Sequence, residues 1–256
     1  MEKKLKAITI FENDDYLVIN KPAGLIVHGG PGITEEVLTD WLRKSYPEIE
    51  TVGEDPLRPG IVHRLDKEAS GLMLIAKTQK AFLHFKKLFQ NRRVVKKYFA
   101  LVHGQISKDE DVINFPIRRA RDGYKMAALP VSSETISDKN KPNNRDRGTI
   151  KAQDESKEAI TEFSVLKKYI NYTFLDVKIK TGRTHQIRVH FYAYGHPLLG
   201  DPLYFTKKTK VKNQKVNLDR IFLVAHELSF KDLNGEKQTF SIKLPSDLEA
   251  FLKKTK

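Results

Sequence analysis

The feature of this sequence that most constrains its fold is an alternating run from Tyr172 to Thr181. One set of alternate positions holds Thr173, Leu175, Val177 and Ile179, and the other holds Asp176, Lys178 and Lys180, with Phe174 as its one apolar residue. Neighbouring side chains of a β-strand point to opposite faces, so the run predicts a strand with one buried face. Gly182 directly follows the run and is expected to end the strand.

Other segments carry strand or helix patterns of their own. Short apolar stretches predict strands at residues 7–11, 16–19, 72–76 and 98–102. Apolar residues at helical spacing predict helices at residues 34–42, 78–93 and 184–194. Thr78 is expected to cap the second of these helices. Near the C-terminus Asn234-Gly235 separates two apolar segments, a strong indication of a β-hairpin. Strands mixed with a few helices predict an α+β fold with a mixed, mostly antiparallel central sheet and flanking helices.

Charge narrows the class of partner. The chain of 256 residues has a formal net charge of +14, which favours RNA, DNA or an anionic membrane surface as the partner. No apolar run reaches the roughly 18 residues that a membrane-spanning helix needs, so we expect no membrane insertion. The absence of cysteine excludes disulfides and thiolate metal sites, and it fits a reducing cytoplasm.

Two polar stretches interrupt these patterns. Residues 132–158 contain no aromatic and almost no apolar residue, so this stretch cannot bury enough surface to order itself. We therefore interpret 132–158 as a mobile polar insertion. The second stretch, residues 206–215, carries five lysines.

The first segment with chemical potential is PGIVHRLDKEASGLMLIAK, residues 59–77. It places His63, Arg64 and Asp66 immediately before the apolar run 72–76. A carboxylate at the mouth of a rigid strand is held in a fixed position, as nucleophilic or general-base chemistry requires. The plainer alternative is that Asp66 caps a turn and Arg64 is its surface partner.

Two further segments carry candidate site residues. Tyr98, in KKYFALVHG (96–104), combines a ring that can stack on a base with a hydroxyl that can relay a proton, although a core tyrosine is the plainer interpretation. In KTGRTHQIRVHF (180–191), Arg183 lies beside the expected helix start, where free backbone N–H groups can bind a phosphate. Arg188 is expected to reach into a cleft, although ordinary solvated charges on a basic protein are the plainer interpretation of Arg183 and Arg188. His185 and His190 are five residues apart, a poor spacing for two metal ligands, so we expect no metal site.

Together and in this order, the three segments resemble the RluA-type pseudouridine synthases. That family is marked by an H-R-L-D-x-x-x-S-G segment, a tyrosine-containing basic strand and a G-R-x-H-Q-I-R segment. NKPAGLIVH (20–28) and GHPLLGDPLY (195–204) are supporting matches, and the resemblance covers residues 7 to about 247. It implies one catalytic domain over residues 1–256, with a central RNA-binding cleft and no cofactor. Many relatives carry a small RNA-binding module before this domain, whereas we expect no such accessory module here.

The resemblance also implies a role for each matching residue. Asp66 matches the essential aspartate, Tyr98 the tyrosine that contacts the target base, and Arg188 the arginine that pairs with the aspartate. Arg64 matches an arginine that fills the space left by the flipped nucleotide. The remaining candidate RNA contacts are His63, Lys97, Arg183 and His185. Glu68-Ala69-Ser70 stands where many relatives have a D-T-S stretch after the aspartate, so one local hydroxyl is missing.

The expected function is therefore the isomerisation of uridine to pseudouridine in ribosomal or transfer RNA, by a cytoplasmic monomer. Which RNA and which uridines are modified stays open. A non-catalytic RNA-binding or ribosome-assembly protein explains the positive charge equally well, but it gives no reason for an aspartate among arginines. A hydrolytic nuclease normally needs an acidic metal cluster, and the sequence shows none.

Overall fold

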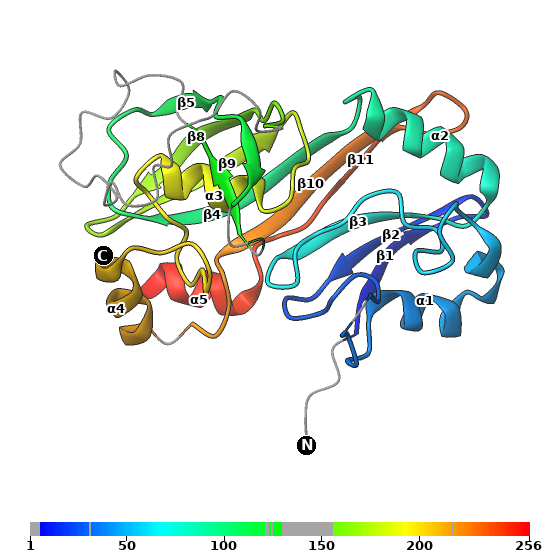
Figure 1. Cartoon of the computed structure of the whole chain (residues 1–256), viewed down its shortest axis with the longest axis horizontal. Helices are drawn as coiled ribbons and strands as arrows, with labels where there is room; N and C mark the ends of the chain where they lie inside the picture. The colour runs from blue at the N-terminus through cyan, green and yellow to red at the C-terminus, as the bar shows by residue number, and fades with distance from the viewer. Residues whose placement is uncertain (1–5, 31, 121–122, 124, 130–155, 217) are drawn as a thin grey trace. The chain divides into compact units, whose positions relative to one another are not determined.

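The structure, a computed structural model, describes residues 6–30, 32–120, 123, 125–129, 156–216 and 218–256. The chain divides into two compact units. The first unit is formed by Met1–Tyr98 and Leu223–Leu244, and the second by Phe99–Phe222 and Pro245–Lys256. Figure 1 labels their helices and strands.

The first unit is built on a sheet whose strands run in the order β1-β2-β3-β10, with β11 paired to β10. The strands are β1 (Ile8–Glu12), β2 (Tyr16–Lys21), β3 (Ser70–Ala76), β10 (Leu223–Lys231) and β11 (Lys237–Ser241). The pairs are antiparallel except for β3 and β10, which run parallel. Strand β3 confirms the strand predicted at residues 72–76, and every one of its residues is buried, as its continuous apolar sequence requires.

Helices cover this sheet. They are α1 (Leu38–Ser45), a 3₁₀ helix (Pro47–Thr51) and α2 (Gln79–Gln90). Thr78 caps α2 as predicted, since its hydroxyl accepts a hydrogen bond from the Ala81 N–H at 3.2 Å. Phe85 of α2 packs edge-on against Tyr16 and Phe230, with ring centroids 5.4 and 5.3 Å away.

Helix α1 begins four residues later than its apolar spacing predicted, so the predicted start at residue 34 is wrong. Val37 is extended, with φ −112°. The backbone N–H groups of Leu38 and Thr39 donate to the carbonyls of Ile26 and Val27, at 2.8 and 3.1 Å. This tertiary pairing holds the preceding residues away from helical geometry.

The second unit has the strand order β4-β9-β8-β5. The chain passes from the first unit into the second within strand β4 (Val95–His103). The other strands of this sheet are β5 (Glu110–Ile113), β8 (Thr161–Lys168) and β9 (Tyr172–Ile179). Strands β6 (Ile117–Arg119) and β7 (Met126–Ala128) form a separate two-stranded sheet. Its helices are α3 (Gln186–Ala193), α4 (Lys207–Lys215) and α5 (Ser246–Lys254). Phe191 of α3 is fully buried against Phe163 of β8, with ring centroids 5.4 Å apart.

The α+β class and the mostly antiparallel pairing are confirmed. Strand β9 alternates as predicted, with Thr173, Leu175, Val177 and Ile179 buried. The predicted hairpin at Asn234-Gly235 is present. Residues 232–236 separate β10 from β11, so the loop is longer than the two-residue turn in which Asn-Gly is usually found.

Other expectations fall outside what the structure describes. Most of the predicted insertion, residues 132–155, lies outside the described residues. One catalytic domain over the whole chain and a central cleft stay predictions. No helix of the described residues is long and apolar enough to cross a membrane.

Candidate active site

A fully buried lysine anchors the loop that carries Asp66. The Lys21 side chain at the end of β2 is 0% exposed. Its Nζ donates to the carbonyl oxygens of Leu25, Pro22 and Lys67 at 2.8, 2.9 and 3.3 Å. The Lys67 carbonyl also accepts the Gly24 N–H at 2.7 Å. Because Lys67 directly follows the half-buried Asp66, these bonds fix the backbone beside the candidate carboxylate.

Arg64 is exposed and is held by a histidine. His28 Nδ1 donates to the Gly29 carbonyl at 2.9 Å, so its Nε2 can accept a hydrogen bond from Arg64 Nη1 at 3.1 Å. Burial is the main cause that lowers the pKa of His28. The hydrogen bond to Gly29 opposes this effect, and the charges of Arg58 and Arg64 add to it. A neutral His28 can thus orient the Arg64 guanidinium without repelling it.

His63 is fixed inside the first unit. Its Nε2 accepts the Leu74 N–H of β3 at 2.9 Å, and its ring stacks on Phe89 of α2 at a centroid distance of 4.5 Å. Burial, and secondarily the charge of Lys96, lowers the pKa of His63 to about 3. The neutral ring therefore joins β3 to α2, and a contact of His63 with RNA stays a prediction.

The charge of Asp66 acts on the hydroxyl of Tyr98. Tyr98 on β4 is 7% exposed. Burial raises the pKa of its hydroxyl well above the ordinary value, and the negative charge of Asp66 raises it further. The hydroxyl consequently stays protonated at neutral pH and can donate a hydrogen bond. The neighbouring Lys97 forms an ion pair with Glu227 of β10, with 3.1 Å between Nζ and Oε2.

In the second unit, Arg188 of α3 forms a buried two-point ion pair with Asp201. The Nε and Nη2 groups of Arg188 donate to the two carboxylate oxygens of Asp201, each at 2.9 Å. The side chains are 1% and 0% exposed. The Asp201 Oδ1 atom also accepts the backbone N–H groups of Leu203 and Tyr204, at 2.8 and 3.0 Å. Such a pair fixes both the plane and the direction of the guanidinium.

Tyr204 extends this arrangement to His185. The Arg188 guanidinium carbon lies 5.4 Å from the centre of the Tyr204 ring, within the range of a cation–π contact. The Tyr204 hydroxyl lies 2.9 Å from His185 Nδ1 and accepts the Met126 N–H, also at 2.9 Å. His185 precedes α3 in a left-handed conformation with φ 54°.

Gln186 organises the turn that carries Arg183. Its Oε1 accepts the Thr181 hydroxyl at 2.7 Å and the Arg183 N–H at 3.0 Å. The half-buried Arg183 side chain donates from Nε to the Glu158 carbonyl at 3.0 Å. The Arg183 backbone N–H is therefore already bonded within the turn, and the predicted phosphate site at this helix start stays a prediction.

Sequence reasoning missed Lys21, His28 and Asp201 as site residues. Each lies in a segment that the family resemblance had marked, NKPAGLIVH or GHPLLGDPLY. Their partners are distant in the sequence, so the pattern marked the segments but not the contacts. The described residues contain no group of three or more histidine or carboxylate side chains placed to hold a metal ion.

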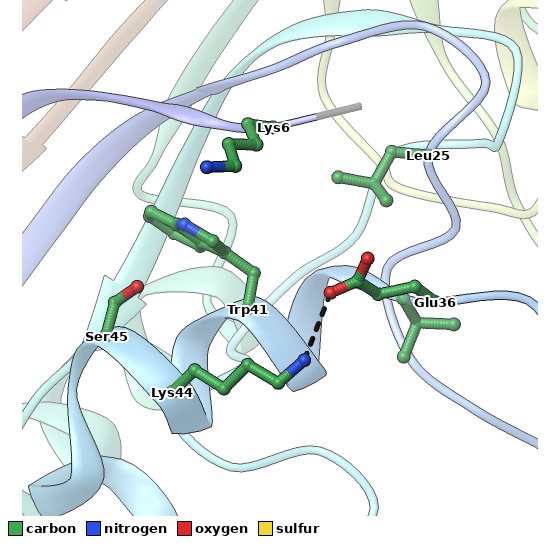
Figure 2. A pocket seen from close by; sticks show the side chains of 7 residues that line it. Lys6, Leu25, Glu36, Trp41, Lys44 and Ser45 are labelled. Carbon is green, nitrogen blue, oxygen red and sulfur yellow. Dashed lines mark hydrogen bonds and ion pairs between the residues drawn. The ribbon is translucent and has the colours of Figure 1, made fainter. Parts of the chain in front are cut away.

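The first unit also has a small cavity of about 210 Å³. Figure 2 shows its lining residues, with Lys44 in an ion pair with Glu36 at 3.3 Å. The cavity is lined by Lys6, Leu25, Glu36, Val37, Trp41, Lys44 and Ser45. None of the predicted site residues belongs to this lining.

The comparisons with known proteins identify the family. The sequence pattern of RNA pseudouridylate synthases matches residues 15–193. The chain belongs to the RNA pseudouridylate synthase family. It is 39% identical to an uncharacterized RNA pseudouridine synthase of Aquifex aeolicus, over 94% of this chain and 70% of that protein. It is 31% identical to the ribosomal large subunit pseudouridine synthase D of Buchnera aphidicola, over 95% of this chain and 71% of that protein.

Solved structures agree with this family. The human RNA pseudouridylate synthase domain containing 4 superposes with a TM-score of 0.71 at 25% identity, over 96% of this chain and 92% of that one. The human RNA pseudouridylate synthase domain containing 1 superposes with a TM-score of 0.69 at 24% identity, over 96% of this chain and 87% of that one. The expected RluA-type relationship is confirmed, and the protein is a pseudouridine synthase that acts on RNA.

Proposed function

We propose that this pseudouridine synthase uses Asp66 as its catalytic carboxylate, works without a cofactor, and modifies ribosomal or transfer RNA. One observation carries the proposal. A half-buried carboxylate, on a loop fixed by Lys21, adds to the larger effect of burial in raising the pKa of the Tyr98 hydroxyl. The reaction first needs a base or nucleophile, which the carboxylate can supply, and later a proton relay, which the protonated phenol can supply.

The chemistry requires no external group. The bond between the ribose and the ring nitrogen breaks, the uracil rotates, and carbon 5 is joined to the ribose, after which the carbon 5 proton is lost. Atoms and electrons balance within the nucleotide itself. Ionised Asp66 either attacks the nucleotide or removes a ribose proton. Tyr98 stacks on the base and helps to move the carbon 5 proton.

Access to the target requires that the base leave its stack, at a cost of a few kcal/mol. Arg64 is suited to occupy the vacated space because it is exposed and oriented by His28. Arg188 is proposed to take part in the same reaction, and this role rests on its match to the family motif. Its rigid attachment to Asp201 is consistent with a group whose direction matters.

The names of relatives suggest which RNA to test first. Several relatives at 31–36% identity are named ribosomal large subunit pseudouridine synthase D. We therefore place large-subunit ribosomal RNA before transfer RNA as the substrate. A monomer acting in the cytoplasm, where both RNAs are available, completes the proposal.

Release of tritium from carbon 5 of labelled uridine tests the reaction directly. The purified protein is incubated with each RNA in the presence of a chelator, and the expected result is release with ribosomal RNA as the better substrate. RNA binding without release would favour a non-catalytic RNA-binding protein. Release that needs added metal would contradict the cofactor-free mechanism.

A further inference from the structure

Helix α4, near the C-terminal label in Figure 1, carries a dense positive charge. Its residues KKTKVKNQK include five lysines and no acidic residue. None of these lysines forms an ion pair with any residue that the structure describes. Lysines elsewhere are often matched, as Lys67 is by Glu35 at 2.7 Å and Lys168 is by Asp109 at 2.7 Å. Within the described part of the chain, the charge of α4 is therefore not matched by an acidic side chain.

The charge pattern of α4 is unfavourable for the helix itself. Lys208 and Lys212 are one turn apart, as are Lys212 and Lys215, so like charges lie next to each other on its surface. Lys207 and Lys208 stand in the first turn, where the positive end of the helix dipole disfavours cations. A negatively charged partner would relieve both effects.

Polar contacts hold α4 in place. The Thr206 hydroxyl accepts the Thr209 N–H at 3.2 Å, and the Thr209 hydroxyl accepts the Thr206 N–H at 2.9 Å. Asn213 Oδ1 lies 2.7 Å from His103 Nε2 and accepts the Gly200 N–H at 3.2 Å. Thr209 is the one buried residue of the helix, so α4 contributes little to the apolar core.

We propose that α4 is a docking surface for the phosphate backbone of the RNA substrate. The inference rests on the proposed function, since it assigns a second, sequence-independent contact to the same RNA. Phosphates complement a row of such lysines, and these contacts position an RNA without reading its bases. An anionic membrane is the poorer fit, because Val211 is the only apolar residue of the helix and a membrane-surface helix needs a broad apolar face.

The anchor of α4 also links it to the candidate active site. Asn213 binds the backbone of Gly200, and the next residue, Asp201, holds Arg188. RNA seated on α4 is consequently attached to the turn that orients Arg188. The surface serves to hold the substrate, and its loss is expected to act on KM rather than on kcat.

A charge-matched pair of variants tests the proposal. The first replaces the exposed Lys207, Lys208, Lys210 and Lys215 with glutamine and retains Lys212, which lies beside His103. The control replaces four other exposed lysines with glutamine, Lys231, Lys237, Lys243 and Lys254. Both variants lose four positive charges. A difference in their RNA binding therefore shows the effect of where the lysines lie, not of the net charge.

Binding of a large-subunit ribosomal RNA fragment and of a tRNA is measured between 50 and 200 mM salt. Each lost phosphate contact lowers the slope of log affinity against log salt by about 0.7–0.9. We expect the slope to fall by two or more for the α4 variant, with a rise in KM, and by less than one for the control. Equal changes in the two variants would overturn the proposal.

Two further measurements separate RNA docking from a folding defect and from membrane binding. The melting temperature of the α4 variant is expected to equal or exceed that of the wild type, because repulsion between lysines is relieved. If the melting temperature of the α4 variant falls below that of the control, the salt slope of RNA binding is measured for the single variants Lys207→Gln and Lys208→Gln instead, and their slopes decide the question. Vesicles containing phosphatidylserine form the membrane arm, and a loss of vesicle binding with an unchanged RNA slope would contradict the proposal. RNA binding is measured without turnover. If the protein shows no catalysis but the salt slope still depends on the α4 lysines, the proposed function is refuted while the docking surface stands.

Discussion

Arg188 and Asp201 form a buried two-point ion pair, with both donor–acceptor distances at 2.9 Å. The two residues are thirteen positions apart and join α3 to the turn before α4. Both carboxylate oxygens of Asp201 accept hydrogen bonds from the guanidinium. One of them, Oδ1, also accepts hydrogen bonds from two backbone N–H groups. Asp201 therefore limits the directions in which Arg188 can point.

Asp201→Asn is expected to lower the free energy of unfolding by about 3 kcal/mol, because it leaves the buried guanidinium of Arg188 without its counter-charge. Activity should fall even under conditions where the variant is folded. Urea titration gives the stability, and Asp109→Asn is the control because the Asp109 side chain is 85% exposed. A loss of stability no larger than that of the control would show that the pair is not energetically important.

Substitution of Tyr98 separates stacking from proton transfer. Tyr98→Phe keeps the ring, so RNA binding should persist while single-turnover product formation slows by about 10²–10⁴-fold, the usual contribution of general acid–base help. Tyr98→Ala should also weaken RNA binding, by about 1–3 kcal/mol, through lost stacking. A Tyr98→Phe rate close to that of the wild type would remove the hydroxyl from the mechanism.

The stability of the protein should fall in mild acid because of His63. Its pKa is about 3 in the folded protein and about 6.5 in an unfolded chain. The unfolded state thus binds the proton more readily, so the stabilisation is fully present above pH 6.5 and is lost as the pH falls toward 3. Between pH 6.5 and pH 5 the expected loss is about 2 kcal/mol, at 1.36 kcal/mol for each pH unit.

His63→Gln removes this titration and provides the control. Urea titrations at pH 7 and pH 5 should show a smaller loss in the variant than in the wild type, by about 2 kcal/mol. His190, whose pKa burial lowers to about 4, remains in both proteins and contributes equally. Identical losses in the two proteins would mean that the His63 ring is accessible to protons in the folded state.

The sequence predicted local structure well where the pattern itself is the cause. The alternation of β9 and the Thr78 cap of α2 depend on neighbouring residues, and both are confirmed. The start of α1 was predicted too early because it depends on bonds to Ile26 and Val27. Helix α4 has no apolar periodicity to reveal it, and its anchor at Asn213 is a tertiary contact with His103.

The candidate site was predictable in its residue types but not in their partners. Family motifs marked Asp66, Tyr98 and Arg188, and the structure adds the electrostatic coupling of Tyr98 to Asp66. The buried partners Lys21 and Asp201 act through contacts with distant parts of the chain, which no local pattern encodes. His63 appeared among charged residues, and its contact with RNA stays a prediction. The structure adds that burial against β3 and Phe89 keeps its ring neutral.

Single-turnover formation of pseudouridine by Asp66→Asn tests the central claim most directly. Asparagine preserves the shape of the side chain but can neither attack the nucleotide nor accept its proton. With large-subunit ribosomal RNA as substrate, we expect RNA affinity near that of the wild type and no detectable product, while the control Asp109→Asn, at an exposed side chain, retains full activity. Product formation by Asp66→Asn at a rate approaching the wild type would contradict the assignment of Asp66 as the catalytic carboxylate.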